Sequence, residues 1–368
     1  MLQNNMLQNN SFLNINTQSP KLIAGPCAAE SFKQLKETAI SLKEGGCTWF
    51  RAGVWKPRTR PGGFEGIGEP AIHWLVEIRN ETGMKVGCEV ANYHQCELAM
   101  DAKLDFIWIG ARTTSDPFAV QEIADCLAKD NNNTIVNPTV IIKNPSSVDY
   151  ELWLGAIERI YNAGITNIVA CFRGFKTYNS KSKYRNEPIW DILLRLRTEH
   201  PEIPVIIDPS HIAGSRELIP EIIETSKYEY GIDNFMIESH CNPSEALTDA
   251  KQQFTPKDMF DILDGLDDNI TIEQEENLNP LPSLRSKIDE IDIKLVDLLY
   301  ERMCVCKEIG KYKKEHGKVI YDGNRWNELL SKIIEYGNSK NDEELVYLIN
   351  KIWAEIHSVS ISEQMKVK

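Results

Sequence analysis

Several features of membrane, secreted and nucleic-acid-binding proteins are missing from this sequence of 368 residues. No apolar run approaches the roughly 18 residues that a membrane-spanning helix needs. Residues 1–19 lack the charged and apolar regions of a signal peptide, and we interpret them as a polar tail. The nine cysteines are odd in number and lack disulfide-framework spacing, which indicates a reducing, cytoplasmic environment. A net charge of −13 without a basic stripe argues against nucleic acid but allows small anionic substrates where positive charge is local.

The sequence does contain eight short apolar, β-branched runs that alternate with helical patterns. Continuous apolar runs are typical of strands buried on both faces of a parallel sheet. Eight such units over about 240 residues predict an α/β fold of the TIM-barrel type, (β/α)8. A doubly wound open sheet is the alternative, but no GxGxxG motif follows the first run. The runs are 21–27, 49–55, 85–90, 106–112, 139–145, 167–174, 204–211 and 235–240.

After residue 262 the pattern changes. We expect a barrel domain over 20–262, an acidic linker over 263–282 and a small three-helix domain over 283–368. Its first helix, about 30 residues and about 45 Å long, is too long for the shorter helices near 322–336 and 342–366 to cover. A partner subunit is therefore expected, as a homodimer or higher homo-oligomer. The apolar seam of the long helix comprises Leu284, Ile288, Ile291, Leu295, Leu298, Val305, Ile309 and Tyr312.

Cations gather where the expected strands end. In a TIM barrel this rim holds the active site, and the segment "RAGVWKPRTRP" (51–61) fixes several cations between two prolines. Such cations would repel one another strongly unless anions lay between them. The rim is therefore predicted to bind phosphate or carboxylate groups through Arg51, Lys56, Arg58, Arg112, Lys143 and Arg173.

The same rim supplies a predicted divalent-metal site. A thiol, an imidazole and two carboxylates form a mixed soft and hard ligand set that suits Mn, Fe, Co or Zn. His240 is the alternative histidine, and Glu89 is expected to orient a cation. The predicted ligands are Cys27, His211, Glu238 and Asp249. A metal beside cations suggests carbon–carbon bond formation, with a polarised carbonyl and anionic partners held in place.

Seven ordered motifs resemble type I beta 3-deoxy-D-arabino-heptulosonate-7-phosphate (DAHP) synthases over about residues 20–262: "AGPCAAE", "RAGVWKPRT", "IGAR", "IIK", "FRG", "DPSH" and "ESHCNPSEALTDAKQ". The resemblance implies condensation of phosphoenolpyruvate with erythrose 4-phosphate, the first step of aromatic amino-acid biosynthesis, and the four metal ligands above. It assigns Lys56 to both substrates and to proton transfer, and Arg58 and Thr59 to the aldose phosphate. Phosphoenolpyruvate would be held by Arg51, Arg112, Lys143 and Arg173.

Related octulosonate-phosphate synthases carry "KANRSS" where this chain has "KPRT", which favours the four-carbon aldose. Two departures from the family pattern concern loops. Residues 60–63 read Arg-Pro-Gly-Gly where Ser-Pro-Tyr is expected, and Asn144-Pro145 follows Lys143.

In the helical segment Arg302 falls on the apolar seam, and a buried Arg requires an anionic partner or ligand. Residues 283–366, with "LRSKIDEIDIKLVDLL" and "IGKYK", resemble all-helical chorismate mutases. By that resemblance Arg302 and a partner subunit's Arg285 bind the carboxylates of chorismate, and Lys313 and Gln364 stabilise charge on the ether oxygen. Ser360, Asp322 and Arg325 complete the site, and no cofactor is implied.

One departure concerns Trp326, which stands where that family usually has a Glu that contacts the substrate hydroxyl. A shifted loop could restore the contact through Asn327 or Glu328; the alternative is a domain that binds chorismate well and catalyses poorly. The main prediction is thus a bifunctional enzyme that also converts chorismate to prephenate. The alternatives are a synthase whose helical domain senses chorismate or prephenate, and a metal aldolase of unrelated substrate. An active mutase is also expected to report prephenate to the barrel.

Overall fold

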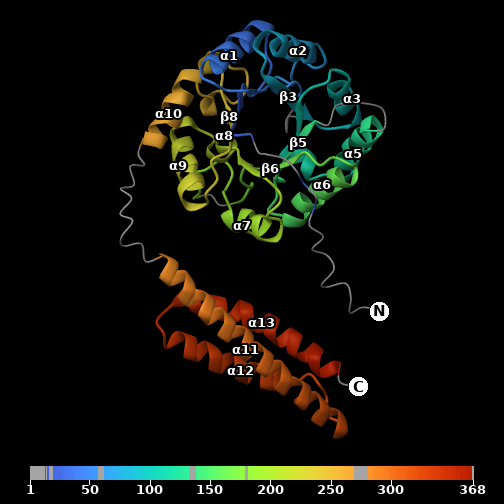
Figure 1. Cartoon of the computed structure of the whole chain (residues 1–368), viewed down its shortest axis with the longest axis vertical. Helices are drawn as coiled ribbons and strands as arrows, with labels where there is room; N and C mark the ends of the chain where they lie inside the picture. Colours follow the sequence, from blue (N-terminus) through green and yellow to red (C-terminus); the bar gives the residue numbers. More distant parts are fainter. Residues whose placement is uncertain are drawn as a thin grey trace. The chain divides into compact units, whose positions relative to one another are not determined.

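The computed structural model describes residues 13, 15, 20–56, 62–131, 138–178, 181–268 and 281–366. The chain divides into two compact units, Met1–Thr271 and Ile272–Lys368, and each is described by itself. Figure 1 shows a ring of strands surrounded by helices in the first unit and helices alone in the second. In the described part, no helix is long and apolar enough to cross a membrane.

The first unit is a closed barrel of eight parallel strands in sequence order, with β8 paired to β1. This confirms the predicted TIM-barrel fold. All eight expected strands are present; β3 has the predicted bounds, and each of the other seven is shorter than its apolar run. The strands are β1 (Leu22–Gly25), β2 (Trp49–Arg51), β3 (Lys85–Val90), β4 (Phe106–Ile109), β5 (Thr139–Lys143), β6 (Ile168–Phe172), β7 (Val205–Ile207) and β8 (Phe235–Glu238).

Helices surround the barrel (Figure 1) because each presents one apolar face to the outside of the strands. Side-chain caps define where several begin; for example, the Ser31 hydroxyl accepts a hydrogen bond from the backbone N–H of Gln34. The helices are α1 (Phe32–Glu44), α2 (Pro70–Thr82), α3 (Tyr93–Asp101), α4 (Ala111–Thr114), α5 (Pro117–Asn131), α6 (Tyr150–Asn162), α7 (Trp190–Glu199), α8 (Pro209–Ala213), α9 (Ile219–Glu224) and α10 (Pro256–Asp268), with short helical turns at Arg216–Leu218, Thr225–Glu229, Pro243–Glu245 and Ala250–Gln252.

The carboxyl ends of β1 and β2 approach each other closely. Gly25 ends β1 with φ +146°, and a Cβ there would lie 2.0 Å from the carbonyl oxygen of Arg51. Only glycine permits this approach, which brings the segment after β1 over the mouth of the barrel. The expectation that Arg112 ends the fourth strand is wrong, because β4 stops at Ile109 and, after Gly110, α4 begins at Ala111 and carries Arg112.

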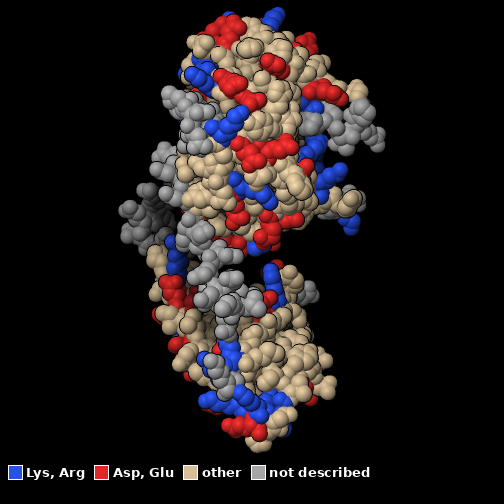
Figure 2. All heavy atoms as spheres, turned by 90° about the vertical axis from the view of Figure 1, so that its right-hand side faces the viewer, with Lys and Arg blue, Asp and Glu red and all other residues tan. Residues whose placement is uncertain are grey.

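The second unit consists of α11 (Leu281–Glu315), α12 (Gly323–Asn338) and α13 (Glu343–Met365). α11 and α13 approach closely at Gly310, where a Cβ would lie 2.8 Å from the carbonyl oxygen of Gln364. The apolar seam predicted on α11 is exposed along its length, from Leu284 to Tyr312. Figure 2 shows a broad face of this unit with few charged side chains, whereas charges of both signs are interspersed over the visible face of the barrel.

The predicted domain bounds concern the segment between the last barrel helix and α11. The last barrel helix, α10, continues through residue 268, and α11 begins at residue 281. Residue 262 therefore lies inside α10, and 269–280, within the predicted linker, lies outside the described residues. The predicted bounds stay a proposal.

Candidate active sites

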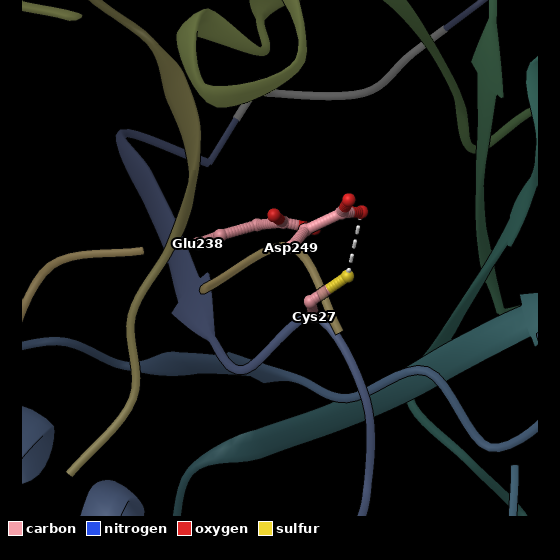
Figure 3. A group of neighbouring side chains, drawn as sticks. All are labelled: Cys27, Glu238 and Asp249. Carbon is pink, nitrogen blue, oxygen red and sulfur yellow. Dashed lines mark hydrogen bonds between the residues drawn. The ribbon is translucent and has the colours of Figure 1, made fainter. Parts of the chain in front are cut away.

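Three predicted metal ligands lie together at the mouth of the barrel (Figure 3). Cys27, Glu238 and Asp249 each offer a donor atom, and these atoms lie within 4.8 Å of one another. The Cys27 thiol donates to Asp249 Oδ2 at 3.3 Å. Glu238 is the last residue of β8, whereas Asp249 lies in the following loop with the left-handed φ of 47°, a conformation that favours glycine. Backbone strain at this position is consistent with a functional site.

His211 lies beside this group. Its Nε2 is 3.7 Å from Glu238 Oε1, and its Nδ1 is 2.8 Å from Asp208 Oδ2. Asp208 also caps α8, since its other carboxylate oxygen accepts from the backbone N–H of His211. A carboxylate behind the far nitrogen is the usual partner of a metal-binding imidazole, because it fixes the ring's orientation. His240 is engaged elsewhere: its Nδ1 accepts from the backbone N–H of Asn242.

These donors fit a divalent cation. Burial lowers the pKa of His211, which favours the neutral imidazole that metals bind. Burial raises the pKa of Asp249, but the charge of nearby Arg185 lowers it, and the net result is a pKa of about 2. Burial and Glu238 raise the pKa of Cys27 to about 12, so the thiol is neutral unless a strong cation is next to it. A sulfur, a nitrogen and carboxylate oxygens at one point suit Mn, Fe, Co or Zn.

A pocket of about 570 Å³ opens next to the donors and is strongly cationic. His211, Asp249 and Glu89 line it, which places it against the donor cluster. Glu89 accepts a hydrogen bond from Trp108 Nε1 at 3.0 Å. The cations that line the pocket are Lys56, Arg112, Lys143, Arg173, Lys176 and Arg185.

Four of the six predicted rim cations therefore face one pocket. Lys56 Nζ donates to Cys27 Sγ at 3.0 Å, which joins the pocket to the donor cluster. Arg51 lies deeper: it is fully buried, donates to Glu238 at 3.2 Å and stacks on Trp108. Arg58 and Thr59 lie outside the described residues.

Arg173 is anchored by two asparagines. Its backbone N–H donates to Asn144 Oδ1 at 2.7 Å, and its guanidinium donates to Asn186 Oδ1 at 3.0 Å. Burial lowers the pKa of Arg173 to about 10, so an anion in the pocket would offset the cost of keeping it charged. Asn144, which departs from the family pattern, thus joins the ends of β5 and β6.

Sequence reasoning missed two pocket cations. Arg185 donates to Asp249 Oδ1 at 3.0 Å, and Lys176 lies three residues after Arg173. Both follow β6 in the chain, so their place after a strand end was the signal that could have found them.

Asp208 was also missed, although it directly precedes α8. It accepts from Lys143 Nζ at 2.6 Å, and both side chains are buried. Burial opposes ionisation, but His211 and Lys143 lower the pKa of Asp208 well below its usual value. Asp208 therefore remains ionised inside the barrel.

Asp208→Asn should destabilise the barrel, because it leaves the Lys143 ammonium buried without a counter-charge. We expect a loss of about 3–5 kcal/mol, or a Tm about 10 °C lower by circular dichroism. The matched control is Asp233→Asn, which breaks an exposed ion pair with Lys21 and should cost at most about 1 kcal/mol. Equal Tm values for the two variants would contradict this role.

The predicted residues of the helical unit also come together. Arg302 on α11 donates to the Ser360 hydroxyl on α13. Ser360 and Gln364 are buried, and Gln364 Oε1 has no hydrogen-bond partner among the described residues. Lys313 donates to the carbonyl of Ile320 at 2.5 Å, one helical turn after the close approach of α11 to α13. Arg302 and Ser360 thus meet between α11 and α13, on the helix face that carries the unsatisfied Gln364, whereas Lys313 bonds to the segment that follows α11.

The remaining predicted residues of this unit lie at its surface. Asp322 caps α12 by accepting from the backbone N–H of Arg325 at 3.0 Å. The guanidinium of Arg325 is 3.5 Å from the carboxylate of Glu328. Arg285 is exposed near the start of α11. It precedes Arg302 by 17 residues, about 25 Å along one helix, so the two cannot meet within one chain.

Comparisons with known proteins give a family match for each of the two units. The family model described as DAHP synthetase I family matches residues 8–272, and chorismate mutase type II matches residues 284–365. A phospho-2-dehydro-3-deoxyheptonate aldolase from Thermotoga maritima is 32% identical over 231 residues, covering 63% of this chain and 64% of that protein. A 2-dehydro-3-deoxyphosphooctonate aldolase from Helicobacter pylori is 27% identical, covering 67% of this chain and 94% of its own.

A solved structure of a DAHP synthase from T. maritima superposes with a TM-score of 0.60 at 28% identity, covering 69% of this chain and 70% of that one. The barrel is therefore similar to proteins named as aldolases and synthases of phosphorylated 3-deoxy-sugar acids. The chain belongs to the DAHP synthetase I family, and a chorismate mutase type II domain follows the barrel. It spans 64% of the length of the curated Thermotoga relative.

Proposed function

We propose that the barrel condenses phosphoenolpyruvate with erythrose 4-phosphate to give DAHP and phosphate, and that the helical domain rearranges chorismate to prephenate. The observation that carries the first activity is the pocket in which six cations adjoin a sulfur, nitrogen and carboxylate donor cluster. Two phosphorylated substrates, one also a carboxylate, require such a concentration of positive charge.

In the reaction, C3 of phosphoenolpyruvate bonds to the aldehyde carbon, the aldehyde oxygen gains a proton, and water replaces the phosphate on C2. Lys143 and Arg173, both buried, hold the phosphoenolpyruvate anion together with Arg112, while Arg51 steadies Glu238. Lys56 is the proton donor, because its Nζ lies 3.0 Å from Cys27 Sγ and thus next to the donor cluster.

A divalent metal held by Cys27, His211, Glu238 and Asp249 would supply polarisation of the aldehyde carbonyl. The chain's own residues bind and orient the two anions around that point. Arg58 and Thr59 are proposed to hold the aldose phosphate.

The substrate assignment is tested by the ultraviolet loss of phosphoenolpyruvate with added Mn²⁺. Erythrose 4-phosphate should support turnover, whereas a five-carbon aldose phosphate, the partner needed for an eight-carbon product, should not. Preference for the five-carbon sugar would overturn the four-carbon assignment, and no turnover with either sugar would overturn the proposed synthase. The DAHP-forming relative is 32% identical, against 27% for the octonate-forming one, which supports the four-carbon sugar.

For the mutase, the rearrangement is unimolecular, so cations placed at the carboxylates and the ether oxygen are enough. Arg302 binds a carboxylate, and Lys313 and Gln364 stabilise charge at the ether oxygen. Ser360, Asp322 and Arg325 complete the proposed site.

We infer that a second copy of the chain completes this site. The α11 seam leaves Leu284, Ile288 and Leu295 about half exposed, which is unusual for a row of large apolar side chains. An antiparallel second α11 would cover the seam and bring its Arg285 to the first copy's Arg302. The proposed assembly is therefore a homodimer or higher oligomer through the helical domain.

The two activities are proposed to be coupled through prephenate. Millimolar prephenate should slow the synthase of the full-length protein severalfold. Prephenate is formed downstream of the barrel's product, so its binding at the helical site would act as feedback on the barrel. In Arg302→Ala, which loses the ligand's main anchor, the same prephenate should leave the synthase rate unchanged. An unaltered rate in the wild-type protein would end the coupling hypothesis, and inhibition that survives in Arg302→Ala would place the effector elsewhere.

A further inference from the structure

Trp326 and His357 form a stacked pair beside the mutase site. Their rings lie 4.1 Å apart, centroid to centroid, with an interplanar angle of 19°. Tyr321 approaches the same imidazole, with centroids 6.3 Å apart. The pair joins α12 to α13, and Tyr321 comes from the segment between α11 and α12.

His357 shares a helix face with the proposed catalytic residues. It precedes Ser360 by three residues and Gln364 by seven on α13, a spacing that places the three on one side. Arg302, which contacts Ser360, lies close enough to act on the imidazole: burial and then Arg302 lower the pKa of His357. His357 is therefore neutral near pH 7 and lies next to the carboxylate-binding cation.

The Nε2 atom of His357 is buried and has no hydrogen-bond partner among the residues that the structure describes. An unsatisfied buried polar atom costs free energy, and in a site it is commonly kept for a ligand. Gln364 Oε1, on the same face, is unsatisfied in the same way. Stacking on Trp326 holds the ring in place, so Nε2 keeps one direction.

Chorismate has two carboxylates, an ether oxygen and one ring hydroxyl. The cations of the site complement the carboxylates and the ether, which leaves the hydroxyl. A neutral imidazole nitrogen forms one hydrogen bond, as donor or acceptor according to its tautomer, and a hydroxyl accepts either. Asn327 and Glu328, expected from the sequence to make this contact, are both exposed, and the Glu328 carboxylate is 3.5 Å from Arg325.

We propose that His357, fixed by its stacking on Trp326, binds the ring hydroxyl of chorismate through Nε2. Trp326 is then a positioning residue, which acts through the imidazole and makes no polar contact of its own. This inference rests on the proposed mutase activity and names one further substrate contact in that site.

The test compares chorismate with its ring-methyl ether, in which the hydroxyl is methylated, on full-length wild type, His357→Ala and His357→Gln. We expect wild type to prefer chorismate about tenfold or more, and His357→Ala to lose that preference by losing kcat/KM on chorismate alone. Gln offers an amide hydrogen bond and should restore part of the preference. His316→Ala, an exposed histidine at the end of α11, is the matched control and should behave as wild type.

An unchanged preference for chorismate in His357→Ala would overturn the assignment. If both His357→Ala and His357→Gln lost activity equally on the two substrates, the role of His357 would be structural, and the assignment would also fail. Calorimetry with prephenate separates this failure from failure of the mutase itself. If wild type binds prephenate but does not turn chorismate over, the proposed catalysis fails, and weaker binding to His357→Ala still supports the contact. Equal prephenate binding to wild type and His357→Ala, or no binding to wild type, would overturn the proposed contact.

Discussion

Cys27→Ala should abolish the synthase activity and leave the mutase intact. The thiol is one of three donors within 4.8 Å, and its removal leaves a divalent ion without its only soft ligand. Loss of about 4 kcal/mol of transition-state stabilisation corresponds to a rate about 1,000-fold lower. The purified variant should also carry less metal by elemental mass spectrometry. A chelator should reproduce the effect on wild type, and added Mn²⁺ should reverse it there but not in the variant.

Cys47→Ala is the matched control for this experiment. Cys47 is also buried, but it precedes β2 at the opposite end of the barrel, 3.3 Å from the carbonyl oxygen of Trp49. We expect wild-type metal content and near wild-type turnover. Full synthase activity in Cys27→Ala would exclude the thiol from the site, and comparable loss of mutase turnover would mean that the two domains depend on each other.

Arg302→Ala should remove chorismate turnover. Loss of a charge-assisted hydrogen bond to a substrate carboxylate costs about 3 kcal/mol, which corresponds to a rate about 150-fold lower. Chorismate consumption is followed by its ultraviolet absorbance, and the synthase rate of the same preparation shows that the barrel is folded.

Lys307→Ala removes another cation of α11, whose exposed side chain pairs with Glu363 at 3.6 Å, and it should turn over normally. If Arg302→Ala kept wild-type turnover, the proposed mutase site would be wrong. If wild type itself were inactive but bound chorismate by calorimetry, the helical domain would be a sensor attached to a synthase, which is the alternative that the sequence left open.

The barrel was predictable because its strands are continuous apolar runs and its site residues lie at or just after strand ends. Arg51, Lys143 and Glu238 are each the last residue of a strand, where sequence alone indicates the direction of approach. Arg185 was harder to predict, because it lies in a long segment between β6 and α7 that has no periodic pattern. Asp208 was hidden for another reason: it follows β7 whereas Lys143 ends β5, so their contact passes across β6 and depends on the closed barrel.

In the helical domain the apolar periodicity predicted the helices, and the position of Arg302 on the seam predicted a polar cluster. No sequence pattern singled out His357, because an isolated histidine on a helix usually has no special function. The proposed role of His357 rests on its stacking with Trp326 and on its unpaired Nε2, and both depend on how α12 and α13 pack together. Whether Asn327 or Glu328 reaches the site depends likewise on how α12 is rotated about its axis, and residue type does not determine that rotation.

The shared carboxylate of Asp208 has an evolutionary consequence. One oxygen, Oδ2, serves both the ammonium of Lys143 and the ring of His211, so a proposed substrate cation and a proposed metal ligand depend on the same atom. A change at any one of the three positions alters the charge or geometry of the other two. Evolution toward another substrate or another metal would therefore require two or three substitutions together. If they arose one at a time, the intermediate protein would have a destabilised barrel.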